Sequence, residues 1–194
     1  MTIYSLDEGT VLVKAARHAI ELYLKSARFD RKIIDKMVSR FTGHNGISVS
    51  IMHYPLGEPR GSAGFVKGVK PINLVLIDAA IAAASEDSRF VPVSHHELEH
   101  ILIEVNVFSE PQKLKKNAKI GKKGVMVEYG FRRGFMLPSE IKKGAKTEEV
   151  LEEVCKRAGL QPHDSLRSDV VFHTLTAQTF RETSPSGSVE EVSK

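Results

Sequence analysis

Four stretches of the chain carry apolar residues at the spacing of an α-helix. They are residues 5–27, 33–41, 71–86 and 148–158. The first opens with Ser5 and Glu8, which are spaced as a capping box. The third is apolar nearly all round, which predicts a helix at the centre of the fold. The fourth ends at Gly159, a residue type that favours a helical C-terminus.

Other stretches alternate between apolar and polar residues, which predicts strands. They are residues 47–53, 62–66, 101–109, 124–129, 134–137 and 170–180. The pattern is clearest in 101–109, where the odd-numbered positions from 101 to 107 carry Ile or Val and the even-numbered positions include Glu104. Residues 130–133 separate two of the strands and predict a hairpin turn. Residues 183–194, rich in Ser, Gly and Glu, predict a flexible C-terminal tail.

Between the first predicted strand and the apolar helix lies the stretch Gly57–Gly64, with the sequence GEPRGSAG. Three glycines and one proline in eight residues predict a tight turn with an unshielded backbone. Arg60 adds a planar fork of donors that suits a carboxylate or a phosphate. We therefore interpret this stretch as an anion-binding turn, although a tight connection between strands needs the same glycines.

The composition excludes several classes of protein. Hydrophobic residues at 41% and charged residues at 27% are typical of a globular chain. No apolar run approaches the roughly 18 residues of a membrane helix, and the N-terminus does not resemble a secretion signal. The single cysteine, Cys155, excludes an internal disulfide framework and favours the reducing cytoplasm. It lies on the apolar side of its helix, so we expect a buried, unreactive thiol.

Residues 96–100, HELEH, match the HExxH pattern of zinc hydrolases. There, two histidines one helical turn apart bind the metal and the glutamate acts as the general base. Ser94 and Glu97 predict a helix start, but the strand from Ile101 leaves room for only about two turns. No third ligand is identifiable. We interpret the motif as a solvated helix face and keep His96 and His100 as a weaker metal hypothesis.

Charged residues lie at the ends of several predicted elements. Asp87, Arg89 and Glu104 could gather around Arg60, either as structural ion pairs or as a substrate clamp. Glu104 is notable because a carboxylate among Val and Ile needs a partner or a wet cleft. Ser62 is read as a turn residue, since no Ser-His-Asp spacing supplies a base. No catalytic residue and no cofactor can be assigned.

The stretch Lys113–Lys123 contains six lysines and no aromatic residue. A basic stretch can bind nucleic acid through its phosphates, but stacking of bases needs aromatic side chains. We therefore expect a solvated surface here, and the net charge of +4 does not by itself indicate a nucleic-acid partner.

Five blocks of the sequence, in their order and spacing, resemble the AMMECR domain family, whose prokaryotic members are also called AmmeMemoRadiSam system protein A. The blocks are PRGSAG, SEDSRFVPVSHHELEHILIEVNVFSEP, GKKGVMVEYGFRRGFMLP, VLEEVCKRAGL and FHTLTAQTFRE. The resemblance covers roughly residues 9–182. The family's turn typically reads LRGCIG, so Ser62 stands where the family has a cysteine and any role of that thiol is in doubt.

The resemblance implies an α+β fold, with a mainly antiparallel sheet flanked by helices in residues 1–182. It implies a larger and a smaller subdomain with a cleft between them, lined by the glycine turn. The candidate ligand-binding residues are Arg60, Gly61, Ser62, Gly64, Asp87, Arg89 and Glu104.

The resemblance implies no established reaction, and Memo-like and radical SAM proteins are the implied partners. The leading hypothesis is a protein that binds a small anionic ligand in a modification pathway, with enzymatic activity left open. The alternatives are a nucleic-acid-binding or regulatory protein that uses Lys113–Lys123, and a zinc hydrolase.

Overall fold

The computed structural model describes residues 4–25, 31–115 and 118–192. Its contacts divide these residues into two compact units. The first unit combines residues 4–107 with residues 178–192, and the second is the continuous segment 108–177. The first unit is thus built from two parts of the chain that are far apart in sequence.

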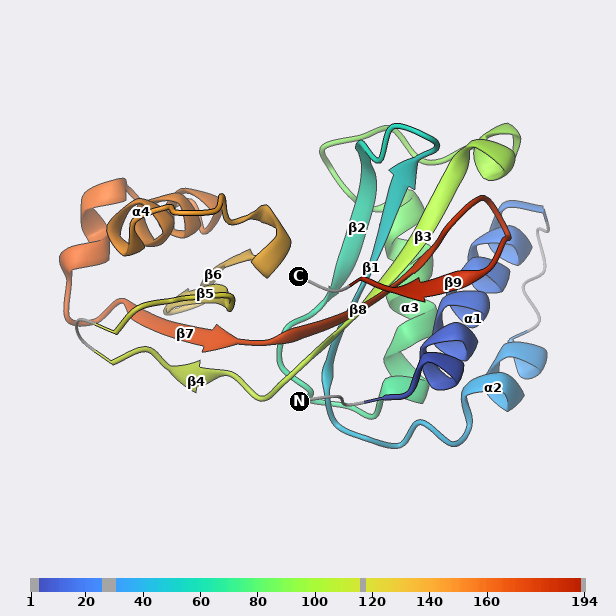
Figure 1. Cartoon of the computed structure of the whole chain (residues 1–194), viewed down its shortest axis with the longest axis horizontal. Helices are drawn as coiled ribbons and strands as arrows, with labels where there is room; N and C mark the ends of the chain where they lie inside the picture. The colour runs from blue at the N-terminus through green and yellow to red at the C-terminus, as the bar shows by residue number, and fades with distance from the viewer. Residues whose placement is uncertain (1–3, 26–30, 116–117, 193–194) are drawn as a thin grey trace. The chain divides into compact units, whose positions relative to one another are not determined.

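The first unit is a five-stranded sheet with helices on one face (Figure 1). Its helices are α1 (Leu6–Lys25), α2 (Lys32–Val38), α3 (Ile72–Ser85) and the short 3₁₀ helix η1 (His95–His100). Its strands, in sheet order, are β2 (Pro59–Phe65), β1 (Gly46–His53), β3 (Ile101–Phe108), β8 (Ala177–Glu182) and β9 (Val189–Glu191). Strand β1 pairs with β2, and β8 with β9, in antiparallel fashion.

The core of the first unit lies between the sheet and helices α1 and α3. The residues that alternate toward it are Ile47, Val49 and Ile51 on β1 and Ile101, Ile103, Val105 and Val107 on β3, all fully buried. The predicted faces of these strands are therefore confirmed. The predicted capping box of α1 is also present, because the Ser5 N–H donates to Glu8 and the Glu8 N–H donates to Ser5 Oγ.

The second unit is a four-stranded sheet covered by one helix, α4 (Thr147–Arg157) (Figure 1). Its strands, in sheet order, are β4 (Gln112–Lys113), β7 (Val171–Leu175), β5 (Gly124–Tyr129) and β6 (Arg132–Met136). Two 3₁₀ helices, η2 (Pro138–Glu140) and η3 (Pro162–Leu166), flank α4 in sequence. Its pairings β4–β7, β7–β5 and β5–β6 are antiparallel, which confirms the predicted α+β class with antiparallel sheets.

Helix α4 packs its apolar side against the second sheet. Val150, Val154 and Cys155 are buried in one cluster with Val125 and Val127 of β5. Burial raises the pKa of the Cys155 thiol above its usual range, with nearby carboxylates as a further cause, so this side chain is an apolar core residue as expected. No helix in residues 4–25, 31–115 or 118–192 is long and apolar enough to cross a membrane.

The prediction of a tight turn over Gly57–Gly64 was wrong. Residues 59–65 form strand β2, which pairs with β1 so that Gly61 lies opposite Ile51 and Ser62 opposite Ser50. The chain reverses earlier, at residues 54–56. Proline at the first position of an edge strand is compatible with pairing on one side, which the composition-based reading overlooked.

Three further predictions differ from the structure. Residues 170–180 form two strands in different sheets, β7 and β8, rather than one strand. Within the expected tail, residues 189–191 form β9 and pair with β8, while residues 193–194 lie outside the described residues. The turn of the second unit's hairpin is shorter than expected, because β6 already begins at Arg132.

Candidate functional site

Arg60, the expected ligand-binding arginine, is buried and bound within the protein. Its side chain is 8% exposed. Its Nε and Nη2 atoms donate to the carboxylate of Glu97 over 2.7 and 3.1 Å. Its Nη1 and Nη2 atoms also donate to the backbone carbonyls of Val91 and Pro92, over 2.8 and 3.3 Å. Arg60 therefore joins β2 to the segment before η1 and to η1 itself.

The HELEH motif lies in η1, a 3₁₀ helix rather than an α-helix. In a 3₁₀ helix the side chains that align are three residues apart, so His96 and His100 do not share a face as they would in a zinc hydrolase. Glu97 accepts the Ser94 N–H over 2.8 Å as well as the Arg60 donors. Among the residues that the structure describes, no cluster of three or more His, Cys, Asp or Glu could hold a metal ion.

Burial pushes the pKa of Glu97 upward, but hydrogen bonds from Arg60 and from the Ser94 backbone outweigh it, so the net pKa is lowered. A carboxylate held in this way stays ionised and is a weak base. Glu97 thus closes a capping box and pairs with an arginine, which are structural roles.

Ser62, Asp87 and Arg89 form a second group, at the end of α3 and on β2. Asp87, whose side chain is 8% exposed, accepts the Ser62 N–H over 2.8 Å. It also accepts Arg89 Nε and Nη2 over 2.9 and 2.6 Å in a bidentate ion pair. Arg89 Nη2 donates to Ser62 Oγ over 2.8 Å, while its side chain stays 59% exposed.

The hydrogen bond from Arg89 is the largest cause of the low pKa of Asp87. Together with the backbone N–H groups of Arg89 and Ser62, it lowers that pKa from 3.8 to about 2, against the effect of burial. Asp87 is therefore ionised at any physiological pH and fixes the position of the Arg89 guanidinium.

Packing within the protein explains why the two candidate positions on β2 carry glycine. A Cβ atom on Gly61 would lie 2.2 Å from the carbonyl oxygen of Ala83, so glycine lets β2 approach α3. Gly64 has φ +156°, and a Cβ atom there would lie 2.3 Å from the carbonyl oxygen of Ile47. Both close approaches are to the protein's own backbone.

Glu104 belongs to a third group, on the sheet face opposite the core residues of β3. Its carboxylate accepts Asn106 Nδ2 over 3.2 Å and lies 3.8 Å from Arg181 on β8. The Thr179 hydroxyl continues the chain by donating to Asn106 Oδ1 over 2.8 Å. The partner of this buried carboxylate is an arginine, as expected. It is Arg181, however, and not Arg60 or Arg89.

The structure therefore brings Ser62, Asp87 and Arg89 together and assigns Arg60 and Glu104 to other partners. Strand β1 separates β2 from β3, so Ser62 and Glu104 lie on strands about 10 Å apart, at roughly 4.8 Å per step.

A buried ion pair between Arg17 and Glu182 escaped the sequence reading. Arg17 Nη2 donates to Glu182 over 2.6 Å and to the Ile101 carbonyl over 2.8 Å, and the Ile103 N–H donates to Glu182 over 2.9 Å. Arg17 is 5% exposed and Glu182 is 2% exposed. The sequence did contain a signal of this ion pair, because Arg17 lies on the apolar face of α1.

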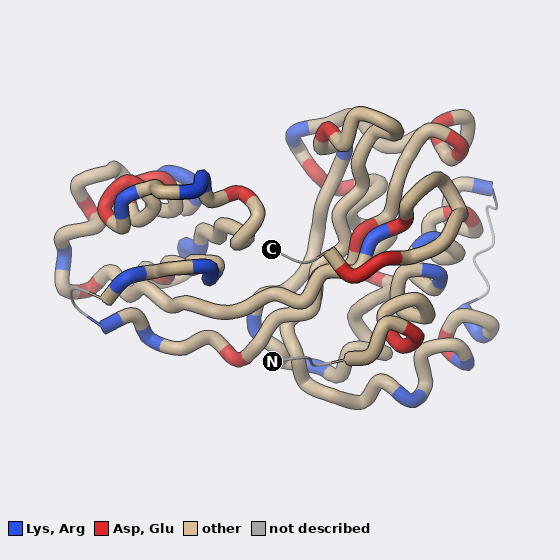
Figure 2. The backbone as a smooth tube through the Cα atoms, in the orientation of Figure 1, with Lys and Arg blue, Asp and Glu red and all other residues tan. Residues whose placement is uncertain are grey.

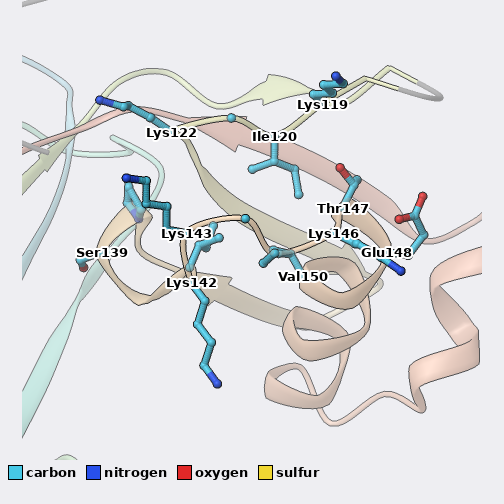
Figure 3. Close-up of a pocket in the computed structure, with 15 residues that line it drawn as sticks. Lys119, Ile120, Lys122, Ser139, Lys142, Lys143, Lys146, Thr147, Glu148 and Val150 are labelled. Atoms are coloured by element: carbon cyan, nitrogen blue, oxygen red, sulfur yellow. The ribbon is translucent and has the colours of Figure 1, made fainter.

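A pocket of about 780 Å³ lies within the second unit (Figure 3). Residues from two parts of the second unit line it: 119–122 from the first part, and 138–139, 141–148 and 150 from the second. Lysines mark the segments before β5 and before α4 (blue in Figure 2). Lys119 and Lys122 come from the basic stretch noted in the sequence, whereas the lysines of residues 142–146 were not singled out.

Comparison with known proteins places the chain among uncharacterised relatives. The chain is 36% identical over 200 residues to Protein MJ0810 of Methanocaldococcus jannaschii, covering 98% of each chain. It is 36% identical over 198 residues to Protein MK0488 of Methanopyrus kandleri, covering 96% of this chain and 94% of that protein.

A crystal structure of the uncharacterised protein PH0010 from Pyrococcus horikoshii has the same fold, with a TM-score of 0.87 and 31% identity. That likeness covers 97% of this chain and 98% of the crystallised chain. The AMMECR1 family model matches residues 13–180. The chain therefore belongs to the AMMECR1 family.

Proposed function

We propose that this protein binds a small anionic ligand at Ser62 and Arg89. The observation that carries the proposal is the fixed, exposed guanidinium of Arg89, held by a buried Asp87 beside the Ser62 hydroxyl. Arginine presents five N–H donors in a rigid fork, and hydrogen bonds to Asp87 and Ser62 hold Nε and Nη2 in place. Because these bonds already set the orientation of the exposed guanidinium, an anion that binds to it loses less entropy.

Ser62 supplies a second donor for the same ligand. Its Oγ lies 3.5 Å from Asp87 Oδ2, at the long limit of a hydrogen bond, so the hydroxyl proton is weakly held there. The Ser62 hydroxyl can donate a hydrogen bond to a ligand oxygen while its Oγ continues to accept the hydrogen bond from Arg89 Nη2. The site offers binding and orientation without a base, because the low pKa of Asp87 makes it a poor proton acceptor.

The test is titration with inorganic phosphate and with succinate, monitored by the amide NMR signals of residues 61–64 and 89. Arg89→Ala should abolish the shifts; it should also cost part of the stability that Arg89 gives the buried Asp87, so the fold of the variant is checked by circular dichroism. Arg31→Ala is the matched control, since Arg31 is also an exposed, ion-paired arginine of the first unit. Equal binding by wild type and Arg89→Ala would refute the proposal.

We further propose that this binding serves a modification pathway with Memo-like and radical SAM proteins as partners, as the resemblance of the sequence to the AMMECR domain family implies. Co-purification of the chain with these two proteins, expressed together, tests that part separately. Loss of the complex in Arg89→Ala, with retention in Arg31→Ala, would connect the partners to the anion site.

A further inference from the structure

We infer that the second unit contains a separate binding site for a small amphipathic anion, a phosphate or carboxylate joined to an apolar body. The site is the pocket of about 780 Å³ described above. Its size falls within the roughly 300–1,000 Å³ of pockets that bind metabolite-sized molecules. All its lining residues belong to the second unit, so the site is independent of Arg89.

Lysines surround the pocket. Those that line it are Lys119, Lys122, Lys142, Lys143 and Lys146, and Glu148 is the one carboxylate among the lining residues. No ion pair within residues 4–25, 31–115 and 118–192 involves any of these five lysines, whereas Lys156 on the same helix α4 is paired with Glu153 over 3.6 Å. The pocket therefore concentrates positive charge that the described part of the protein does not neutralise, which attracts anions.

The interior of the pocket is apolar. Ile120 and Val150 are 5% and 4% exposed, and Ile141 and Ala145 are half-buried. In Figure 3 the side chains of Ile120 and Val150 point toward one another, with Lys119 and Lys143 on opposite sides of them. A ligand that fits both features carries its charge at the rim and an apolar portion against the isoleucines and the valine.

Two features favour a small ligand over a nucleic acid. The lining residues include no aromatic side chain on which a base could stack. The basic residues come from two separate loops and lie around one hollow, instead of following an extended track along which a phosphate backbone could lie. The first turn of α4 adds N–H groups at Thr147 and Glu148, a further source of positive potential at the rim.

The test uses the fluorescent amphipathic anion 1-anilinonaphthalene-8-sulfonate as the probe, displaced by n-octyl phosphate. The chain contains no tryptophan, so the probe fluorescence is free of overlap. The pocket variant replaces Lys119, Lys122 and Lys143 by Gln. The control variant replaces Lys113, Lys115 and Lys123 by Gln, which removes the same charge from the same unit outside the pocket.

We expect one probe per chain, with affinity about tenfold weaker in the pocket variant and unchanged in the control, because three exposed charges each contribute modestly. Octyl phosphate should displace the probe at a concentration at least about tenfold below that of inorganic phosphate, because only the former reaches the apolar floor. Thermal melting of both variants should match wild type, since all six lysines are exposed.

Equal weakening in both variants would overturn the inference and indicate general electrostatic attraction. Equal displacement by inorganic phosphate and octyl phosphate would also overturn it, because the apolar floor would then play no part. Tighter displacement by a single-stranded oligonucleotide would assign the lysines to nucleic acid. Arg89→Ala should leave probe binding unchanged. The pocket in the second unit and the Ser62–Arg89 site are therefore tested independently of one another.

Discussion

The carboxylate of Glu97 is held by Arg60 through two hydrogen bonds of 2.7 and 3.1 Å. The residue that a zinc hydrolase would use as its general base is therefore the partner of the residue that an anion-binding turn would use as its clamp. Because Arg60 and Glu97 bind each other, Glu97 is not available as a general base and Arg60 is not available as an anion clamp.

Arg60→Ala should destabilise the protein by about 2–4 kcal/mol, because it removes a buried cation and leaves Glu97 without its charged partner. The value lies below that of a fully buried pair because the Glu97 side chain is 28% exposed. Urea unfolding followed by circular dichroism measures the loss. Arg31→Ala, whose ion pairs are exposed, should cost less than about 1 kcal/mol; a similar small loss for Arg60→Ala would contradict the structural role.

Stability should decrease as the pH falls from about 4 toward 2, and Asp87 should account for part of this decrease. Its folded pKa of about 2 lies below its usual value of 3.8, so its ionised form stabilises the fold above pH 3.8. That contribution, about 2 kcal/mol, is lost as the pH falls through the folded pKa. Asp87→Asn should lower stability at pH 7 and flatten the acid branch; an unchanged slope between pH 4 and pH 2 would disprove the assignment.

His96→Ala and His100→Ala should leave both metal content and melting temperature unchanged. Both histidines are exposed, and η1 does not place them on one face. Purified protein should contain zinc well below one equivalent, as measured by plasma mass spectrometry. One tightly bound zinc ion per chain, lost on either substitution, would restore the zinc-hydrolase hypothesis.

Gly61→Ala should destabilise the protein by more than about 2 kcal/mol, because its Cβ atom would meet the Ala83 carbonyl oxygen at 2.2 Å. Gly57→Ala provides the comparison. Its Cβ atom would meet no neighbour, and its φ of +71° alone should cost about 1–2 kcal/mol. If Gly61 served ligand approach instead, the substitution would weaken phosphate binding and leave the urea midpoint unchanged.

Much of the fold could be predicted from the sequence, because periodicity reports which side of an element is buried. The odd-numbered residues 101–107 of β3 share one face, as predicted, and belong to the core cluster of the first unit. Gly159 has the positive φ of +69° expected at the end of α4. Periodicity could not show that residues 170–180 contribute to two sheets, since both strands alternate and only Thr176 separates them. Partner strands are chosen by contacts distant in sequence, which a local pattern does not contain.

The candidate site was predicted in part. The charges at element ends grouped Asp87 with Arg89, and the structure brings these two together with Ser62, which the sequence reading took as a turn residue. The partners of Arg60 and Glu104 could not be predicted, because each is bound to a residue that only the tertiary fold brings near. Lys142, Lys143 and Lys146 went unnoticed for the same reason: they join Lys119 and Lys122 only after the chain has formed β5 and β6.

The discontinuous first unit has a consequence for the order in which the protein forms during synthesis. Its β8 lies between β3 and β9, and Arg17 pairs with Glu182, which is made 165 residues later. The second unit is one continuous segment, and its last strand, β7, leaves the ribosome just ahead of β8. The unit that begins first therefore finishes last, and until then Arg17 has no carboxylate from β8 to neutralise it.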